Sequence, residues 1–350
     1  MDGSIHLFDR LPQVDAVPPA ENDIAISSVR TRPLVGLIRN GRSHRNEGHG
    51  NGRSEGRGSA DELGENVLLA TPHRRSELPA VLADFAEKRV DYLAIDGGDG
   101  TVRDVLTCGA GVFGDCWPML IVLPGGKTNA LALDLGIPTD WSFGDALAAV
   151  QRGGLVRRQP LVIRQRDNDR AQVRGFVMGA GVFNQAITLG QRSHDLGAFN
   201  HAVVAITAVW SMAQAMLGMS GNKWRQGTAM RIQLSSGAEL AHCGGLPADE
   251  RYLMFASTLQ SYPAGLDPFR EVEEPLQVAV LDNPRRRMLL SLPSIFRGKS
   301  TASTRRCGFH VFGDSAVDLD IGDPFILDGE AFPAGQYRLS AGPRLRFVVP

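Results

Sequence analysis

A glycine-rich turn, Gly97-Gly-Asp-Gly-Thr101, holds the residue types in this chain that are best suited to chemistry. It follows a short apolar run from Tyr92 to Ile95 and precedes helical spacing from Thr101 to about Cys108. Such a turn lets main-chain N–H groups approach an anion, and the helix N-terminus adds its positive dipole end. A carboxylate beside a phosphate, here Asp99, requires Mg²⁺ or a hydroxyl group between them, and hard oxygen ligands suit Mg²⁺. The turn therefore predicts a magnesium–nucleotide site.

The same turn also has a purely structural interpretation. Thr101 and Asp104 have the spacing of a capping box, in which both side chains bind main-chain N–H groups at the start of a helix. The residues favour the nucleotide site and leave the plain tight turn open.

Strands and helices alternate over residues 33–155, which predicts a doubly wound parallel α/β sheet. The expected strands are residues 33–38, 66–70, 92–95 and 119–123. In such sheets ligands bind beyond the carboxyl ends of the strands. Four candidate segments follow these strands and are expected at one edge, namely Asn40, Thr71, Gly97–Thr101 and Pro124–Asn129.

After about Val156 the pattern changes to short strands and turns, so residues 156–350 are predicted to form a β-rich, sandwich-like domain that ends in a strand at Leu345–Val349. A helical insertion is expected over residues 199–219. It reaches the length of a membrane span, but Ser211 and Gln214 interrupt it, which disfavours a span. An exposed apolar face, suited to a greasy co-substrate, and a buried core helix both stay open.

Two segments lack the apolar periodicity of folded elements. Residues 1–32 are polar and proline-bearing, and they are predicted to form a loose tail. Residues 41–60 consist almost wholly of Gly, Arg, Asn, Ser, His and Glu, and they are predicted to form a flexible polar loop.

The composition is that of a soluble globular protein, and 350 residues are enough for two domains. A formal net charge of -1 excludes the strongly basic footprint of a nucleic-acid-binding domain. The four scattered cysteines form no C-x-x-C pair, which indicates free thiols in a reducing cytoplasm. The N-terminus has no apolar h-region, so no signal peptide is expected.

Three motifs in this order, Asp96-Gly-Gly-Asp-Gly-Thr101, Pro124-Gly-Gly-Lys-Thr-Asn-Ala-Leu-Ala132 and Leu327-Asp-Gly-Glu330, resemble the diacylglycerol kinase catalytic-domain family. That family includes bacterial lipid kinases and the sphingosine kinases. NAD kinases share the first motif, and the last favours a lipid kinase. The resemblance implies two domains, with ATP bound between an α/β domain and a β-sandwich.

The resemblance also implies a set of nucleotide-binding residues. They are Asn40, Ser43, Thr71, Gly97, Gly98, Asp99, Gly100, Thr101, Gly126, Lys127 and Asn129. Some positions depart from the family pattern: Gly41 replaces a proline, Lys127 a threonine and Ala130 an aspartate. A lysine in a phosphate loop can act as a point charge on ATP. Gln277 stands where the family has a second metal-binding carboxylate, so we assign no second metal site.

Phosphoryl transfer requires positioned phosphates, Mg²⁺ and an acceptor hydroxyl in line. We assign the backbone of Gly97–Gly100 and Gly125–Lys127 to the phosphates, and Asp99 to the Mg²⁺–ATP complex. The resemblance places the Asp-Gly-Glu segment at the cleft, where Glu330, with Asp328 as second choice, is the expected general base. The alternative is a β-turn whose acidic residues merely face water.

The expected function is therefore an ATP-dependent lipid kinase that transfers the γ-phosphoryl group to a hydroxyl of a membrane lipid, such as diacylglycerol or a long-chain base. It would act in the cytoplasm, in phospholipid metabolism, and a peripheral contact with the inner face of the membrane is left open. Two alternatives remain: an NAD kinase-like enzyme, and a relative that binds lipid or nucleotide without turnover.

Overall fold

A computed structural model describes residues 6–15, 32–41, 43, 65–126, 128–182, 226–244, 246–262, 266–283, 286–295, 297–298 and 302–350. The helix predicted over 199–219, most of the polar loop and Lys127 lie outside these residues. The chain divides into two compact units, each treated by itself below. The α/β unit comprises Pro12–Pro160, Val173–Gly175 and Gly342–Pro350, and the β unit comprises Met1–Leu11, Leu161–Gln172 and Phe176–Ala341.

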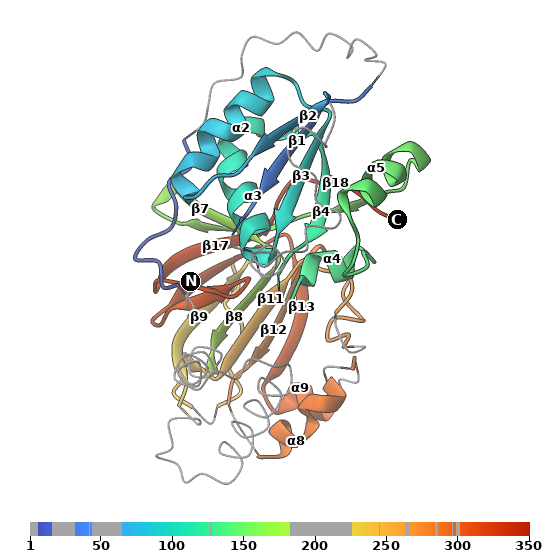
Figure 1. Ribbon diagram of the computed structural model, residues 1–350. Helices are drawn as coiled ribbons and strands as arrows, with labels where there is room; N and C mark the ends of the chain where they lie inside the picture. Colours follow the sequence, from blue (N-terminus) through green and yellow to red (C-terminus); the bar gives the residue numbers. More distant parts are fainter. Residues whose placement is uncertain are drawn as a thin grey trace, which may run out of the picture. The chain divides into compact units, whose positions relative to one another are not determined.

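The α/β unit is built on a six-stranded sheet with the order β2-β1-β3-β4-β18-β5 (Figure 1). Its strands are β1 (Val35–Arg39), β2 (Val67–Ala70), β3 (Tyr92–Gly97), β4 (Met119–Pro124), β5 (Leu155–Arg158) and β18 (Leu345–Val348). The strands β2, β1, β3 and β4 pair in parallel. Since β3 and β4 are almost entirely buried, their sequences read as continuous apolar runs.

Helices follow the strands of this unit as expected from the alternating pattern. They are η2 (Arg75–Glu77), α2 (Leu78–Glu87), α3 (Asp99–Phe113), α4 (Ala130–Asp134) and α5 (Phe143–Arg152). The ring of Phe85 on α2 lies directly over Gly36 of β1, where a Cβ would come within 2.5 Å of it. A capping box of Ser142 and Asp145 begins α5, and Gly153 in a left-handed conformation ends it.

The strand predicted at Leu345–Val349 is present as β18, but its expected place in the β-rich domain is wrong. It runs parallel to β4 and antiparallel to β5, so the sheet of the α/β unit is mixed rather than wholly parallel. Leu345, Phe347 and Val348 are buried there, because β4 offers an apolar edge that local sequence cannot reveal.

The β unit contains two six-stranded sheets, with the orders β10-β9-β14-β17-β6-β7 and β13-β12-β11-β8-β15-β16. The first comprises β6 (Leu161–Gln165), β7 (Asn168–Gly175), β9 (Thr228–Leu234), β10 (Glu250–Arg251), β14 (Ala316–Ile321) and β17 (Gly335–Ala341). The second comprises β8 (Val177–Gly181), β11 (Leu253–Ser257), β12 (Leu276–Leu281), β13 (Phe309–Asp314), β15 (Phe325–Leu327) and β16 (Glu330–Phe332). The helices α8 (Arg286–Ile295) and α9 (Ala302–Arg306) lie between β12 and β13 in the chain. The antiparallel pairing agrees with the predicted β-rich domain.

Residues 6–11, which fall within the loose tail predicted for residues 1–32, make ordered tertiary contacts, and residues 1–5 and 16–31 of that tail lie outside the described residues. Leu7 forms a parallel bridge with Ala331, and Phe8 stacks on Phe332 with ring centroids 4.7 Å apart. Leu11 is only 2% exposed. The prediction missed this segment because its apolar residues are too few to show a period, although each finds a partner in tertiary contact.

Candidate active site

Four loops leave the sheet of the α/β unit at the same edge. In the parallel register Arg39 pairs with Asp96 and Gly97 pairs with Pro124, so the strands β1, β3 and β4 end side by side. The candidate segments at Asn40, Gly97–Thr101 and Pro124–Asn129 follow these ends directly. Thr71, which follows β2, is exposed at this edge.

The two glycine-rich loops are in direct backbone contact. The N–H group of Gly125 donates to the carbonyl oxygen of Gly97 at 2.9 Å. A Cβ on Gly98 would lie 2.9 Å from the Cα of Gly126, which real side chains do not tolerate. The motifs around residues 97 and 125 therefore need glycine in order to meet.

The first-strand loop joins the same assembly. The side chain of Asn40 donates to the hydroxyl of Thr101 at 2.9 Å. The main-chain N–H of Asn40 donates to the main-chain carbonyl oxygen of Asp96 at 2.9 Å. Ser43 is 6% exposed, and its hydroxyl has no partner among the described residues. A Cβ on Gly125 would lie 3.0 Å from that hydroxyl oxygen. A buried hydroxyl without a partner is costly, so this one is suited to a ligand.

Asp99 is the first residue of α3, and its carboxylate points to the start of α4. It accepts hydrogen bonds from the N–H groups of Ala130 at 3.1 Å and Leu131 at 3.4 Å. Burial raises the pKa of Asp99 above its ordinary value, although these donors and the charge of Arg103 act in the opposite direction. The side chain thus caps a short helix and is also a partly buried carboxylate whose charge is incompletely compensated.

The start of α3 offers main-chain donors for an anion. Among the described residues, no acceptor is present for the N–H groups of Gly98, Asp99 and Gly100, as expected for the first turn of a helix. The helix is 15 residues long, so its dipole adds to these donors. A phosphate group fits such a site.

In the second loop, two of the main-chain donors that we assigned to the phosphates are used within the protein. The N–H of Gly125 is used by Gly97, and the N–H of Gly126 donates to the Asn129 side chain at 2.8 Å. The Asn129 amide in turn donates to the carbonyl oxygen of Gly126 at 2.8 Å, and its φ of 52° is left-handed. This loop thus closes on itself and Asn129 shapes it, while the phosphate contacts expected of Gly125 and Gly126 stay a prediction.

Sequence reasoning missed Arg39 at the end of β1. Its Nε donates to the carboxylate of Asp96 at 3.0 Å, and Asp96 is 1% exposed. A carboxylate within a buried strand requires a cationic partner. The position of Asp96 at the end of an apolar run was therefore the signal from which Arg39 could have been found. The pair fixes the end of β3 immediately before the glycine-rich turn.

The Asp-Gly-Glu segment forms the turn of a β-hairpin in the β unit. Leu327 pairs with Glu330, and the two residues between them, Asp328 and Gly329, have φ values of 46° and 86°. Positive φ at both positions is typical of a type I′ hairpin turn, for which Asp-Gly is a preferred sequence. The alternative of a β-turn is thus correct for the backbone.

The two acidic side chains of this hairpin have different surroundings. The carboxylate of Asp328 accepts from the N–H groups of Phe176 at 3.0 Å and Val177 at 2.9 Å, so it holds the start of β8. Glu330 is half-buried, and its carboxylate accepts from the N–H group of His6. Asp328 therefore stabilises the backbone at the start of β8. The carboxylate of Glu330 is instead bound by the N-terminal segment through His6.

Comparison with known proteins points to one family. Residues 35–159, which are less than half of the chain, match the family model described as the diacylglycerol kinase catalytic domain. This part of the chain is similar to that catalytic domain. The resemblance inferred from the three motifs is confirmed.

Solved structures share the fold of this diacylglycerol kinase-like chain. One, described as a diacylglycerol kinase from Bacillus anthracis str. Sterne, has a TM-score of 0.58 at 14% identity. Another structure from the same organism, described as a provisionally assigned diacylglycerol kinase, has a TM-score of 0.62 at 13% identity. Each match covers 92% of this chain and 98% of the other. No curated protein matches the chain. Within the described parts of the chain, none of the helices combines the length and apolar character that a membrane crossing requires.

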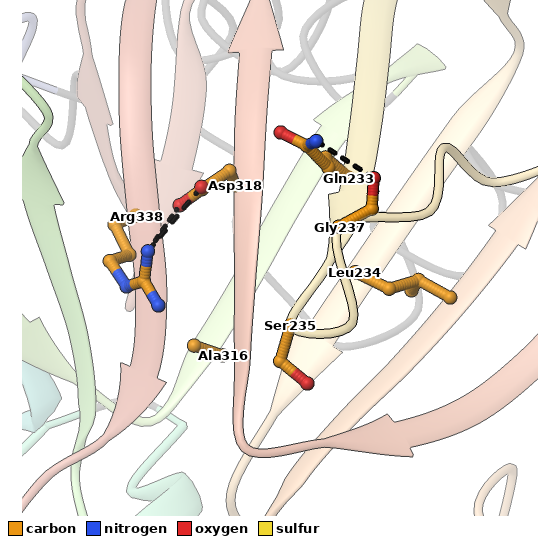
Figure 2. A pocket seen from close by; sticks show the side chains of 7 residues that line it. All are labelled: Gln233, Leu234, Ser235, Gly237, Ala316, Asp318 and Arg338. Carbon is orange, nitrogen blue, oxygen red and sulfur yellow. Dashed lines mark hydrogen bonds and ion pairs between the residues drawn. The ribbon is translucent and has the colours of Figure 1, made fainter.

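A polar hollow in the β unit, of about 160 Å³, is smaller than the pockets that usually hold small-molecule ligands (Figure 2). Its lining residues are Gln233, Leu234, Ser235, Gly237, Ala316, Asp318 and Arg338. Arg338 donates to Asp318 at 3.3 Å across this hollow. We assign it no role in catalysis.

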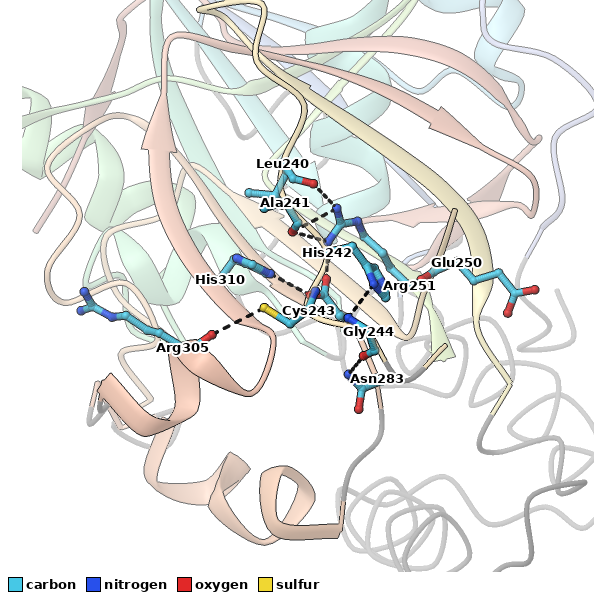
Figure 3. A network of polar contacts seen from close by, with 11 residues as sticks. Leu240, Ala241, His242, Cys243, Gly244, Glu250, Arg251, Asn283, Arg305 and His310 are labelled. Atoms are coloured by element: carbon cyan, nitrogen blue, oxygen red, sulfur yellow. Dashed lines mark hydrogen bonds and ion pairs between the residues drawn. The ribbon is translucent and has the colours of Figure 1, made fainter. Parts of the chain in front are cut away.

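A buried polar network joins Asp282 to Arg251, His310 and Cys243, and Figure 3 labels these three partners. The Asp282 carboxylate accepts from the guanidinium of Arg251, from the His310 ring at 2.9 Å and from the main-chain N–H of Cys243 at 2.9 Å. Burial raises the pKa of Asp282, but these partners outweigh it and hold that pKa below its usual range. Potential metal-ligating atoms of Cys243, Asp282 and His310 lie within 4.8 Å of one another. The carboxylate accepts from a cation and two further donors, so we assign this network a role in stabilising the fold.

Proposed function

We propose that the chain is an ATP-dependent lipid kinase, which transfers the γ-phosphoryl group of ATP to a hydroxyl group of a membrane lipid such as diacylglycerol or a long-chain base. One observation carries the proposal. In a segment that matches the diacylglycerol kinase catalytic domain, the main-chain N–H groups of Gly98, Asp99 and Gly100 have no acceptor among the described residues. They lie at the start of α3, where Asp99 also supplies a carboxylate.

In this proposal the first turn of α3 binds phosphate oxygens of ATP through those N–H groups. The buried Ser43 hydroxyl, 3.0 Å from where a Gly125 Cβ would lie, supplies one more donor at the same place. Asn40 holds the hydroxyl of Thr101 and thereby the geometry of the turn. Together these groups position a phosphate chain, which is the main requirement of phosphoryl transfer.

The residues also fit Mg²⁺, because the partly buried Asp99 carboxylate has a raised pKa and a divalent cation would compensate its charge. When bound, Mg²⁺ neutralises charge on the phosphates. Asp99 would hold it while still accepting from the N–H groups of Ala130 and Leu131, since each carboxylate oxygen has a second lone pair.

We assign the general base to Glu330. Its carboxylate is oriented by the His6 N–H and can take the proton of the lipid hydroxyl. Asp328 is less suited to this task, because three hydrogen bonds from Phe176 and Val177 occupy it. The structure thus supports the order of preference that the motif implied, with Glu330 before Asp328.

A second candidate function has an observation of its own. Ala130 stands where the family has an aspartate, and the N–H groups of Gly125 and Gly126 are used within the protein. A chain with fewer phosphate contacts could bind nucleotide or lipid without turnover. An NAD kinase-like activity is the remaining enzymatic alternative.

The decisive experiment supplies the purified chain with Mg²⁺–ATP and a panel of acceptors that includes diacylglycerol, a long-chain base and NAD. We expect a phosphorylated lipid and no phosphorylated NAD. Asp99→Asn keeps an acceptor for the start of α4 and removes the charge, so it should retain the fold and lower turnover by about 100-fold or more.

Asp145→Asn is the matched control, because Asp145 caps α5 in a similar way, by accepting from the N–H of Ser142 at 2.9 Å. If Asp99 is only a helix cap, both variants will keep full turnover. Nucleotide binding measured by calorimetry, with no product from any acceptor, would support the candidate without catalysis. Phosphorylated NAD with inert lipids would support the NAD kinase-like alternative.

A further inference from the structure

One short segment between β12 and β13 is rich in basic residues and has no acidic ones. Residues 284–307 hold seven of the 37 Lys and Arg residues and none of the 38 Asp and Glu residues. These seven are Arg285, Arg286, Arg287, Arg297, Lys299, Arg305 and Arg306. Because the whole chain has a formal net charge of -1, the rest of it is distinctly acidic. We call residues 284–307 the basic segment, and it contains α8 and α9.

The helix α8 is anchored to the β unit by one face. Met288 and Ile295 are 2% and 1% exposed, and they belong to a core cluster with Phe269 and Phe309. Their spacing of seven residues places them on the same side of the helix. Figure 1 shows α8 and α9, in orange, as neighbours at one end of the β unit.

The opposite face of α8 presents a large apolar side chain to solvent. Leu290 lies two residues after the buried Met288, which places it about 200° around the helix. It is 64% exposed, the highest value among the large apolar side chains that the structure describes as exposed. An exposed leucine within a polybasic stretch is typical of a helix that lies on an anionic membrane surface.

Neighbouring acidic residues reduce the positive charge but do not cancel it. Arg305 donates to Glu271 at 2.8 Å, and Gly298 packs against the backbone of Asp267. Residues 266–275 hold one arginine and four acidic residues, so basic residues in the two segments together still exceed acidic ones by eight to four. The side chains of Arg297 and Arg306 are exposed.

We propose that the basic segment docks the protein on an anionic lipid surface, with Leu290 inserted among the acyl chains and the exposed Arg297 and Arg306 at the headgroups. This docking rests on the proposed lipid kinase function and gives it a place at which the chain meets its substrate. Nucleic acid would also attract the basic residues, but it offers no apolar region in which the exposed Leu290 could be buried. The exposed leucine therefore favours a lipid surface.

The experiment measures co-sedimentation of the full chain with phosphatidylcholine vesicles, prepared with or without phosphatidylglycerol, in the absence of ATP. We expect binding to the vesicles that contain phosphatidylglycerol, and loss of that binding at high salt. Arg297→Gln with Arg306→Gln should weaken binding by roughly 30-fold, since each basic side chain near such a surface contributes about a factor of five to six. Leu290→Gln should weaken it by about tenfold.

Matched controls are Arg152→Gln with Arg166→Gln, which removes two exposed arginines elsewhere, and Leu155→Gln, which removes a leucine that is 46% exposed. These should bind as the unaltered chain does. Equal losses in the controls, or binding that ignores phosphatidylglycerol and salt, would overturn the docking proposal.

Activity on two forms of substrate separates this proposal from the function itself. Variants of the basic segment should keep full activity on a monomeric short-chain diacylglycerol and lose it on diacylglycerol in vesicles. A chain that docks on vesicles but phosphorylates no lipid would overturn the kinase proposal alone. Vesicle-bound diacylglycerol phosphorylated equally well by these variants would overturn the docking alone.

Discussion

Gly98 and Gly126 face each other so closely that a Cβ on Gly126 would lie 2.7 Å from the Cα of Gly98. One glycine follows β3 and the other follows β4, and the contact joins the two motifs that carry the family resemblance. The N–H groups of Gly98, Asp99 and Gly100, which have no acceptor among the described residues, begin at this contact.

Gly126→Ala should therefore separate the two loops. We expect a loss of about 1–3 kcal/mol in the free energy of unfolding, as for overpacking elsewhere, and a larger loss of ATP binding. Denaturant unfolding and calorimetry measure the two effects. Gly144→Ala is the control, because its Cβ would meet only the Ser142 hydroxyl at 3.7 Å, within a helix where alanine is favoured. Unimpaired ATP binding by Gly126→Ala would contradict the assignment of this turn.

Substitutions at Asp328 and Glu330 should have different effects on stability and on turnover. Glu330→Gln keeps an acceptor for the His6 N–H but cannot take a proton, so lipid phosphorylation should fall about 100-fold or more with little change in thermal stability. Asp328→Asn tolerates the positive φ of 46° and should lose stability while it keeps most of its turnover per folded molecule. The opposite pattern would make Asp328 the base.

The network around Asp282 predicts a pH dependence of stability. Hydrogen bonds and the charges of His310 and Arg251 lower the pKa of Asp282 despite its burial. A lowered folded-state pKa contributes stability above the unfolded-state value, about 3.9, and that stability is lost as pH falls through the lower folded value. Asp282→Asn should cost about 3 kcal/mol at neutral pH and flatten the acid limb of the unfolding curve.

Two further variants test the cause of that effect. Adding Arg251→Met to Asp282→Asn should recover part of the loss, because no buried cation is then left unpaired. Glu271→Gln breaks the exposed pair with Arg305 and should cost at most about 1 kcal/mol. A loss for Glu271→Gln as large as that for Asp282→Asn would show that burial is not the reason.

Tyr337 predicts a dependence at the alkaline end. Burial raises the pKa of Tyr337 to about 12, and its hydroxyl donates to the carbonyl oxygen of Pro333 at 2.7 Å. Its contribution to stability is complete below the ordinary pKa of about 10 and is lost as pH rises toward the raised value. Tyr337→Phe should cost about 1 kcal/mol and remove the tyrosinate absorbance that appears at about pH 12. An unchanged absorbance titration in Tyr337→Phe would contradict this assignment.

Much of the α/β unit could be predicted from the sequence because its signals are local. Apolar runs at Tyr92–Ile95 and Met119–Leu123 predict buried strands, and the glycines that follow predict turns at one sheet edge. The order of the three motifs also indicates the family resemblance without the tertiary structure. Gly97 and Gly98 were recognisable because a strand-to-helix turn that approaches an anion closely favours glycine. In the structure a Cβ on Gly97 would lie 2.5 Å from the Thr101 side chain, and one on Gly98 would lie 2.9 Å from the Cα of Gly126.

Tertiary structure decided what depends on contacts between distant segments. Local patterning marks a strand at Leu345–Val348 but not which sheet it joins, and pairing with β4 placed it in the α/β unit. A carboxylate has the same chemistry in every sequence, yet Phe176 and Val177 give Asp328 a structural task, while His6 orients Glu330. The sequence by itself thus determined the strands, the turns and the set of reactive side chains. Their partners were decided only in the folded chain, because hydrogen bonds and burial depend on distances in space rather than along the chain.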